Sequence, residues 1–316
     1  MTNEGVVDRS EPSSIRIPSR GRHSVQAWCI GLGRKAASIR DGCQREPVRF
    51  LAYALIATSF VFMAMPWVDL AVSGWFASAE GDFLHARDPI LLAIRDINRK
   101  VPHLVLTAMA AILLAHAFGA RSGWLVRPHQ AIFVFGVYAI GSGLVVSLLK
   151  EMVGRARPED TVPFGGTAPY TLPWQFADAC ARNCSFSSGE AGSAAAMLSC
   201  VMLAPASIRR PLFWSMVPVA IVFSLLRVAF GKHFLSDVVV SWLLVALVAV
   251  VLWRWLERHA ETIDRATVGS GGPLAAGTRR RLQTATGMVS KWRADRSASR
   301  ANPGSSRKTV FSRLAG

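Results

Sequence analysis

The stretch HFLSDVVVSWLLVALVAVVLW, residues 233–253, decides the class of this protein. From Val238 onward it carries no charged side chain. A helix that crosses the hydrocarbon core of a bilayer needs about 20 predominantly apolar residues. The sequence therefore predicts a membrane-spanning helix over residues 235–256, with His233 and Asp237 close to its polar end.

The composition of the whole chain agrees with a membrane protein. The 316 residues are 51% hydrophobic and carry a formal net charge of +16, a combination that is rare in soluble proteins. Nucleic-acid binding is the other usual explanation of a strongly basic chain. Here the basic residues lie mostly in the two tails and in short loops between apolar runs, which follows the positive-inside rule. We therefore expect membrane lipids as partners and no nucleic acid.

Further apolar runs predict an all-α bundle of six transmembrane helices. The fourth run contains Gly192 and Ser193 followed by three alanines, and small residues of this kind let helices pack closely. We therefore expect this run inside the bundle. The six runs cover about 49–67, 103–119, 129–150, 189–205, 212–230 and 235–256.

The basic residues also predict the domain limits and the topology. We expect a basic, disordered tail at 1–48, a membrane domain at 49–256 and a second basic tail at 257–316. Both tails and the loops at 121–127 and 209–210 carry the positive charge that marks the cytoplasmic side. The loops at 69–102, 151–188 and 231–234 then face the opposite side, together with several cations that the positive-inside rule does not explain.

Two shorter apolar patterns lie outside the predicted spans. The spacing of apolar residues from Ile90 to Ile97 predicts a short helix, either on the outer membrane surface or packed on the bundle. The stripe from Leu282 to Trp292 is either a helix on the inner membrane surface or part of a disordered basic tail. The first 47 residues lack a short apolar core, so we expect no cleaved signal peptide and an uncleaved first span.

The segment KEMVGRARP, residues 150–158, places two cations near the outer end of the third span. Lys150 and Arg157 are seven residues apart, which is about two turns and roughly 10 Å on one face of a helix. Pro158 disfavours a helical residue before it and ends the segment. The alternative is a pair of interfacial basic side chains that extend to water.

A histidine and an aspartate lie one helical turn apart before the last span. His233 and Asp237 have i,i+4 spacing, so they share one helical face. A carboxylate beside a histidine can fix the tautomer of the imidazole and stabilise its protonated form. Arg227 adds a third cation nearby. The alternative is a purely structural His–Asp pair.

The segment CSFSSGEAGSA, residues 184–194, opens the fourth predicted span. Ser188, Gly189 and Glu190 lie where the helix begins, and a helix N-terminus offers free N–H groups and a positive dipole end to an anion. Three cations, a helix N-terminus and a His–Asp pair on one predicted face indicate a bound phosphate and a nucleophilic histidine.

These three motifs resemble those of the type 2 phosphatidic acid phosphatases, whose fold core is shared with vanadium haloperoxidases. The family signatures are Lys, six residues, then Arg-Pro; Pro-Ser-Gly-His; and Ser-Arg, five residues, His, three residues, Asp. The first is complete here, and the third has Leu226 in place of serine. The second reads Ser187-Ser188-Gly189-Glu190, so its proline and its histidine are both replaced. The resemblance covers residues 49–256 and is greatest to the bacterial lipid A phosphatases.

The resemblance implies a role for each matching residue. His233 would attack phosphorus to form a phosphohistidine, with Asp237 orienting its ring. The residue after the glycine, a histidine in the family and Glu190 here, would protonate the leaving oxygen and then activate water. The phosphoryl oxygens would be held by the side chains of Lys150, Arg157, Arg227 and Ser188 and by the N–H of Gly189.

Glu190 has alternative explanations that the sequence leaves open. Ser187 and Glu190 have the spacing of a capping box, in which the glutamate only satisfies a backbone N–H at the helix start. The replacement of histidine is also compatible with a protein that has lost catalysis. His85 and His103 lie on the same predicted side and are potential substitutes for the missing histidine.

Cysteine and histidine spacing gives no sign of a metal site, so we expect neither a metal nor another cofactor. Of the five cysteines, only Cys180 and Cys184 are close in sequence. They can form a disulfide if their loop lies in an oxidising compartment.

Together these features predict an integral membrane phosphatase of a lipid phosphomonoester. The resemblance to the bacterial lipid A phosphatases implies the 1- or 4′-phosphate of lipid A as the substrate. It would be a multi-pass protein of the bacterial inner membrane with both termini cytoplasmic and a periplasmic active site. One alternative is a phosphatase of undecaprenyl diphosphate or phosphatidylglycerophosphate, or a lipid phosphotransferase. Another is a non-catalytic binder or translocator of lipid phosphates. The head group and the oligomeric state are not encoded in any motif.

The predicted topology can be tested by cysteine-accessibility labelling on intact cells. Single cysteines introduced in residues 69–102 or 151–188 should react with a membrane-impermeant reagent without permeabilisation, because both loops are expected outside. Cysteines in either tail should react only after permeabilisation. The opposite pattern in residues 151–188 would invert the topology.

Overall fold

The computed structural model describes residues 46–120 and 125–269. Residues 1–45 and 270–316 of the predicted basic tails lie outside the described residues, and so does the apolar stripe from Leu282 to Trp292. The predicted limit of the membrane domain at residue 256 is wrong, because α9 continues to Asp264. The described residues form helices and irregular loops without a β-strand; one isolated bridge pairs Thr161 with Ala168. The described residues from Leu51 to Gly269 belong to one compact unit.

Five helical runs in the described chain are long and apolar enough to cross a membrane. The fourth predicted span, 189–205, is the helix α7, Gly189–Met197, continued by the 3-10 turn η5, Leu198–Leu203, and this run is shorter than a spanning helix. The protein is therefore a multi-pass helical membrane protein, and a count of six spans stays a prediction. The five long runs are α2 Pro47–Ala64, α4 Pro89–Ala117, the continuous run of α5 Pro128–Gly136, η2 Val137–Val145 and α6 Val146–Val153, then α8 Ala206–Ala229 and α9 Leu235–Asp264.

The helix α7 lies inside the bundle, as its small residues predict. It contacts α4, α8, α9 and η2. Ala191, Ala194 and Ala196 are fully buried, and the position of a Cβ on Gly192 would lie only 3.4 Å from Val146. Side chains of this size allow neighbouring helices to approach closely in a membrane. The N-terminus of α7 is therefore held firmly by its neighbours.

The prediction of a separate short helix at residues 90–97 is wrong. Those residues are the first turns of α4, which continues through Pro102 to Ala117 as one helix of 29 residues. The side chain of Asp88 caps its start by accepting from the N–H groups of Ile90 and Leu91 at 2.8 and 3.0 Å. A proline normally interrupts a helix, but in membrane helices the freed backbone groups can be satisfied by neighbouring structure.

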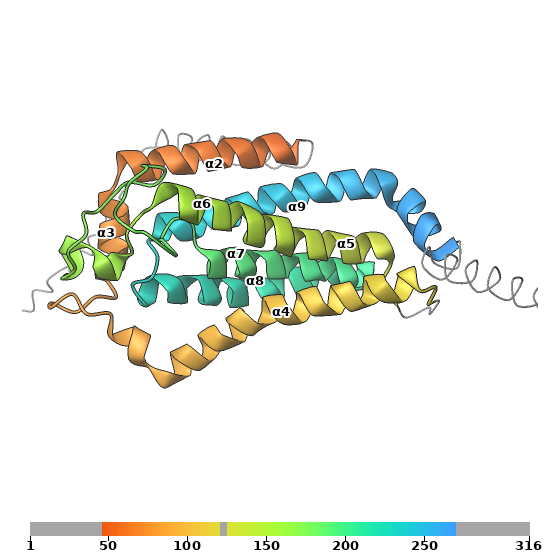
Figure 1. The fold of residues 1–316 in the computed structure, drawn as a ribbon, viewed down its shortest axis with the longest axis horizontal. Helices are drawn as coiled ribbons and strands as arrows, with labels where there is room; N and C mark the ends of the chain where they lie inside the picture. Colours follow the sequence, from red (N-terminus) through yellow and green to blue (C-terminus); the bar gives the residue numbers. More distant parts are fainter. Residues whose placement is uncertain (1–45, 121–124, 270–316) are drawn as a thin grey trace, which may run out of the picture. The chain divides into compact units, whose positions relative to one another are not determined.

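Figure 1 shows the polar end of the bundle, where the short helix α3, Trp67–Gly74, lies with the loop after α6 and the start of α9. The helix α6 ends because Gly154 adopts a left-handed conformation with φ +64°, and any Cβ there would collide with the carbonyl of Ala177. Gly231 makes a similar turn between α8 and α9 with φ +63°, against the ring of Phe83. These two turns bring the three sequence motifs to one end of the bundle.

The prediction that Lys150 and Arg157 share one continuous helix is also wrong. Lys150 lies in the last turn of α6, whereas Arg157 follows the turn at Gly154 in extended backbone. The loop that follows folds back on this segment, since Ser185 N–H donates to the carbonyl of Arg155 at 2.8 Å. Both cations still reach the same place, but the loop fold positions them rather than helical periodicity.

Candidate active site

The two cations of the first motif converge on Asn183. The Lys150 Nζ donates to the Asn183 side-chain oxygen at 2.9 Å, and the Arg157 guanidinium donates to the Asn183 carbonyl at 2.9 Å. A methyl group at Gly189 would lie 3.9 Å from Cε of Lys150, so the start of α7 is adjacent. The first and second motifs therefore meet, as the sequence predicts.

The N-terminus of α7 faces this cation cluster with its backbone donors. Ser188 is the N-cap, and its hydroxyl accepts from the N–H of Ala191 at 3.4 Å. The N–H of Ser188 itself donates to the carbonyl of Asp237 at 3.3 Å, which ties α7 to α9. Among the described residues, the N–H of Gly189 has no acceptor. Free N–H groups in a first helical turn form an anion-binding site.

His233 is buried beside the cluster, with 2% of its surface exposed. Its Nδ1 lies 2.6 Å from the carbonyl oxygen of Ser185. A carbonyl can only accept, so Nδ1 carries the proton and the lone pair is on Nε2. Burial, together with the charges of Arg227 and Lys150 and against the opposing effect of Asp237, lowers the pKa of His233 to about 4. The imidazole is therefore neutral at pH 7, the form that can act as a nucleophile.

Asp237 lies next to His233, but its oxygen is 3.8 Å from Nδ1, beyond a hydrogen bond. Its carboxylate instead accepts from the Ser185 hydroxyl at 2.5 Å, the Phe234 N–H at 2.9 Å and the Arg155 guanidinium at 2.6 Å. The Ser185 residue thus contacts both partners, with its carbonyl on the histidine and its hydroxyl on the aspartate. Asp237 orients the segment that holds the ring, and Ser185 makes the direct contact.

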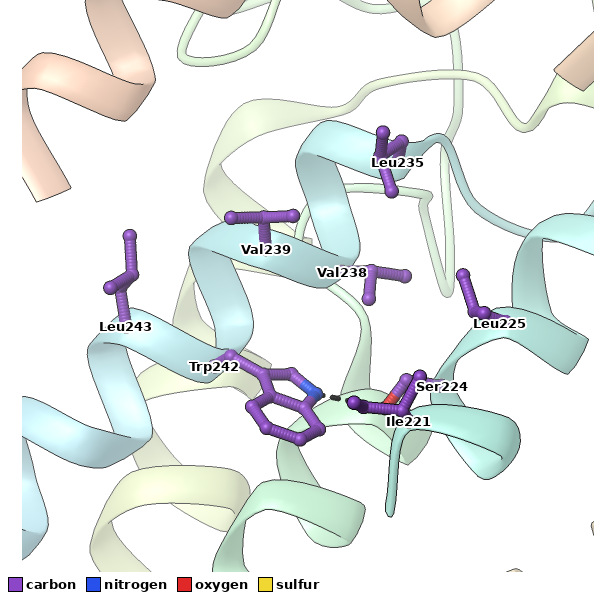
Figure 2. Close-up of a pocket in the computed structure, with 8 residues that line it drawn as sticks. All are labelled: Ile221, Ser224, Leu225, Leu235, Val238, Val239, Trp242 and Leu243. Atoms are coloured by element: carbon purple, nitrogen blue, oxygen red, sulfur yellow. Dashed lines mark hydrogen bonds between the residues drawn. The ribbon is translucent and has the colours of Figure 1, made fainter. Parts of the chain in front are cut away.

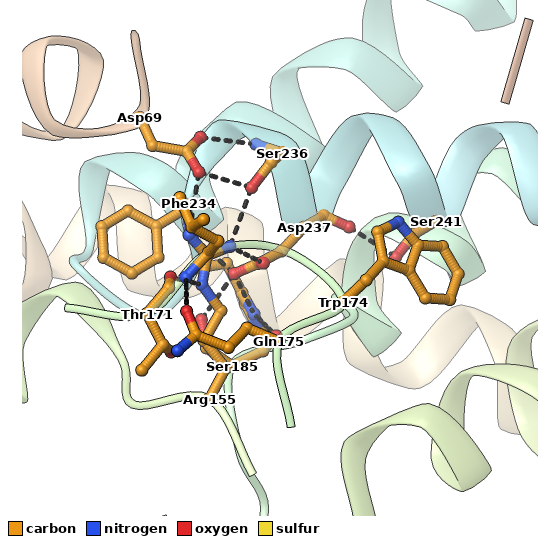
Figure 3. A network of polar contacts seen from close by, with 12 residues as sticks. Asp69, Arg155, Thr171, Trp174, Gln175, Ser185, Phe234, Ser236, Asp237 and Ser241 are labelled. Atoms are coloured by element: carbon orange, nitrogen blue, oxygen red, sulfur yellow. Dashed lines mark hydrogen bonds and ion pairs between the residues drawn. The ribbon is translucent and has the colours of Figure 1, made fainter. Parts of the chain in front are cut away.

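Arg155 is the residue on which these contacts converge, and the sequence reasoning did not assign it a role. Figure 3 shows its buried guanidinium between Asp69 and Asp237, at 2.9 and 2.6 Å. It also donates to the Ser236 hydroxyl at 2.8 Å and the Thr171 carbonyl at 2.9 Å. A position inside KEMVGRARP was the only sign in the sequence, because its partners are distant along the chain.

Asp69 supplies the second carboxylate from α3 and is fully buried. It accepts from the N–H and the hydroxyl of Ser236 at 2.8 and 2.5 Å. Burial raises the pKa of Asp69, and the neighbouring Arg155 opposes this shift. The helix α3 is therefore joined to the first turn of α9, next to His233.

The carboxylate of Glu190 lies between two arginines. Its Oε2 is 3.3 Å from Arg227 and 3.5 Å from Arg95 of α4, and its backbone carbonyl accepts from Asn98 at 3.1 Å. The capping-box alternative is wrong, because Ser188 is the N-cap and, within the described chain, no backbone N–H bonds to this carboxylate. Arg95 was missed because residues 90–97 were expected in a separate helix.

Arg227 has unused donors that point to an anion. The side chain is 5% exposed, and among the described residues its Nε and Nη1 make no hydrogen bond, although Nη1 lies 3.3 Å from the Glu190 carboxylate as an ion pair. Buried donors are nearly always paired, so the Nε without an acceptor indicates a missing partner. The carbonyl of Arg227 accepts from the N–H groups of Lys232 and His233 at 3.1 and 3.2 Å, which fixes the distance between arginine and histidine.

The other candidates from the sequence lie apart from this cluster. His85 packs against the ring of Phe76 with 5.9 Å between centroids, and His103 is exposed on α4. No hydrogen bond or ion pair connects either histidine to the cluster within the described chain. Cys180 and Cys184 are joined in a disulfide in the loop that carries Asn183. In the described ranges, no group of three or more metal-ligating side chains occurs.

An apolar groove begins beside the site, between α8 and α9 (Figure 2). It has a volume of about 380 Å³ and contains one polar contact, from the Trp242 indole N–H to the Ser224 hydroxyl at 2.8 Å. The first turns of α9 contribute Leu235 and Val238 to the groove, whereas Asp237 faces the polar network. A polar cluster and an apolar groove therefore share one helix end.

The site brings together cations that retain free N–H donors, a helix N-terminus and a neutral buried imidazole. These groups are the ones that a membrane phosphatase needs. The PAP2 superfamily model matches residues 131–261, and this chain belongs to the PAP2 superfamily. The protein is a phosphatase of the phosphoric monoester hydrolase class.

The curated relatives carry one name, Lipid A 4′-phosphatase. The protein of Rhizobium etli is 31% identical over 229 residues, covering 67% of this chain and 88% of the relative. The protein of Rhizobium leguminosarum is 32% identical over 229 residues, covering 67% of this chain and 97% of the relative. The protein of Francisella tularensis subsp. novicida is 27% identical over 204 residues, covering 63% of this chain and 91% of the relative.

The buried network predicts that Arg155→Ala destabilises the fold. The change leaves Asp69 and Asp237 buried without their cation, and breaking a buried pair in this way typically costs about 3–5 kcal/mol. Thermal unfolding in detergent measures the loss. Arg87→Ala is the matched control, because that side chain is 77% exposed. A loss for Arg155→Ala no larger than that of the control would contradict a structural role for the network.

Proposed function

We propose that the protein hydrolyses a lipid phosphomonoester, with the 4′-phosphate of lipid A as the first candidate and its 1-phosphate as the second. The main support is the buried Arg227 guanidinium, which has nitrogens that make no hydrogen bond, close in the chain to the neutral ring of His233. The curated relatives of the chain are named Lipid A 4′-phosphatase. The apolar groove between α8 and α9 also suits the acyl part of an amphipathic substrate.

The proposed reaction has two steps and uses groups of the chain alone. The reaction starts from the form in which Glu190 is protonated. The Nε2 of His233 attacks phosphorus, an N–P bond forms, and the P–O bond to the lipid breaks while the leaving oxygen takes the proton of Glu190, which becomes a carboxylate. A water molecule then attacks the phosphohistidine, Glu190 takes a proton from that water, and the N–P bond breaks to release inorganic phosphate. Each step is a displacement at phosphorus with atoms and charge balanced.

The cations of the cluster would stabilise the phosphoryl oxygens in this reaction. Lys150, Arg157 and Arg227 bring positive charge from three segments, and the Gly189 N–H adds a donor at the positive end of α7. The Ser188 hydroxyl can donate to an oxygen while it accepts from Ala191. Preorganised donors of this kind commonly supply the largest part of the rate acceleration.

Glu190 is our candidate for the acid/base group in place of the family histidine. Its carboxylate is bound by Arg227, which we assign to the phosphate site, and the cluster has no contact with His85 or His103 among the described residues. The ion pairs with Arg95 and Arg227 also hold the carboxylate in one direction. General acid–base catalysis by a positioned carboxylate is an established chemical solution.

We place the site at the periplasmic face of the bacterial inner membrane, with both termini in the cytoplasm. The basic tails favour this orientation. The disulfide between Cys180 and Cys184 lies in the loop that forms the site, and disulfides persist in oxidising compartments such as the periplasm.

A panel of lipid phosphates as substrates separates this proposal from its alternatives. Release of phosphate from lipid A by the purified protein would support it, and preference for undecaprenyl diphosphate or phosphatidylglycerophosphate would reassign the substrate. Transfer of the phosphoryl group to another lipid would indicate a phosphotransferase. Binding of lipid A without phosphate release would indicate a non-catalytic binder or translocator.

We predict that His233→Ala abolishes turnover while the protein still folds. Loss of a covalent nucleophile lowers the rate by several orders of magnitude. Because the pKa of His233 is held near 4, the ring stays neutral from pH 8 down to about pH 5, and kcat/KM of the parent should show no loss from its protonation in that range. His259→Ala, an exposed histidine on α9, is the control. Near-normal activity of His233→Ala would rule out the mechanism.

A pair of Glu190 variants tests the acid/base assignment. Glu190→Gln keeps the size and hydrogen bonding of the side chain but cannot transfer the proton, so turnover should fall by roughly 10²–10⁴. Glu190→His restores the family residue and should retain more activity than glutamine, with a pH–rate profile moved toward the imidazole range. A glutamine variant as active as the parent would remove Glu190 from the mechanism.

A further inference from the structure

The loop closed by the disulfide between Cys180 and Cys184 contains the residue that holds two of the phosphate-site cations. Asn183 precedes the second cysteine and has φ +52°, a left-handed conformation that asparagine tolerates better than most residues. Both of its oxygens are used, the side-chain oxygen by Lys150 and the carbonyl oxygen by Arg157, each at 2.9 Å. The closed loop therefore presents one residue to both cations at once.

The hydrogen-bond acceptor that the two cations share is neutral, although the Arg157 guanidinium also lies 3.8 Å from the Glu159 carboxylate. Glu159 forms a tight ion pair with Lys232 at 2.5 and 2.6 Å, and Glu190 faces Arg227 at 3.3 Å. A carboxylate cancels the charge of its partner cation, whereas an amide or peptide oxygen fixes the cation and leaves its charge intact. Asn183 thus holds Lys150 and Arg157 without reducing their attraction for a phosphate dianion.

Enough donors stay free for phosphate while Asn183 is bound. A lysine ammonium has three N–H donors and an arginine guanidinium has five. Lys150 and Arg157 each donate one hydrogen bond to Asn183. The remaining donors can reach phosphoryl oxygens without releasing the loop, so Asn183 has the properties of a permanent support of the site.

We propose that Asn183 is a positioning residue for the phosphate site and that the Cys180–Cys184 disulfide keeps it in place. This inference rests on the proposed function, because it assigns Lys150 and Arg157 to the phosphoryl group. Its consequence is that opening the disulfide weakens phosphate binding through the loss of the Asn183 contacts. The intact disulfide would then be a condition for full activity.

Substitutions of Asn183 separate its two contacts. Asn183→Gly keeps the carbonyl and tolerates a positive φ, so it removes only the amide that holds Lys150. We expect kcat/KM to fall on the order of 10-fold, mainly through KM, and the inhibition constant of inorganic phosphate to rise equally. Asn183→Asp keeps the shape but adds a negative charge, and we expect a larger loss of phosphate affinity with the same fold.

The disulfide is tested in combination with the Asn183→Gly variant. Reduction by a phosphine, or the double change Cys180→Ser and Cys184→Ser, should lower kcat/KM of the parent by a similar factor. The same treatments should have a smaller effect on Asn183→Gly than on the parent, because the Lys150 contact is already absent and only the Arg157 contact is left to lose. Cys200→Ser is the control, since Cys200 lies in η5 and is not in the disulfide. Thermal unfolding checks that each variant folds.

Three outcomes would overturn the inference. Unchanged kcat/KM and unchanged phosphate inhibition in Asn183→Gly would show that Asn183 positions nothing. Equal effects of reduction on the parent and on Asn183→Gly would show that the disulfide acts through another contact. If the parent hydrolyses no lipid, the proposed function fails instead, and calorimetric binding of inorganic phosphate to the same variants then decides the role of Asn183. The third contradiction would be phosphate binding that is the same in the parent, the Asn183 variants and the cysteine variant.

Discussion

The buried guanidinium of Arg155 is the constraint on which the polar end of this bundle depends. A fully buried charge is tolerated only with well-placed partners. Here the partners come from α3 and from the first turn of α9, which must therefore meet the loop after α6. Once Asp237 is fixed in this way, Ser185 is held by it and supports the ring of His233 through its carbonyl. The position and tautomer of the imidazole follow from a cation that does not touch it.

Glu190 shows how a tertiary contact can replace the local role that a pattern suggests. Its spacing from Ser187 is that of a capping box, but Ser188 caps the helix and the carboxylate turns to α4 and α8. Arg95 can reach it because α4 passes through Pro102 without a break. The substitution of the family histidine by glutamate is thus accompanied by an arginine placed to receive a carboxylate. Paired in this way, the Glu190 carboxylate and the Arg95 guanidinium are partly buried beside the buried guanidinium of Arg227.

The sequence was informative where the physical signal is local or repeated. Apolar runs gave the membrane helices, and the motifs around Lys150, Gly189 and His233 predicted residues that the structure does bring together. It was uninformative where partners are remote, since Arg155 and Asp69 are 86 positions apart and Arg95 and Glu190 are 95 apart. Residues 90–97 and the span from residue 103 were expected as two helices, but α4 continues through Pro102, where surrounding helices can satisfy the groups that a proline frees. Such contacts depend on the packing of the whole bundle and leave no spacing to recognise.

The segment KEMVGRARP carries two kinds of cation whose different partners explain their different uses. Arg155 is bound by two carboxylates and has a structural role, so its charge is not available to a ligand. Lys150 and Arg157 donate to the neutral oxygens of Asn183, Arg157 also lies 3.8 Å from the Glu159 carboxylate, and the Nε of Arg227 has no acceptor among the described residues. After the turn at Gly154 the two arginines take different partners, Arg155 the buried carboxylates of Asp69 and Asp237 and Arg157 the carbonyl of Asn183. A basic stretch of nine residues can therefore build the support of a phosphate site and supply its ligands at the same time.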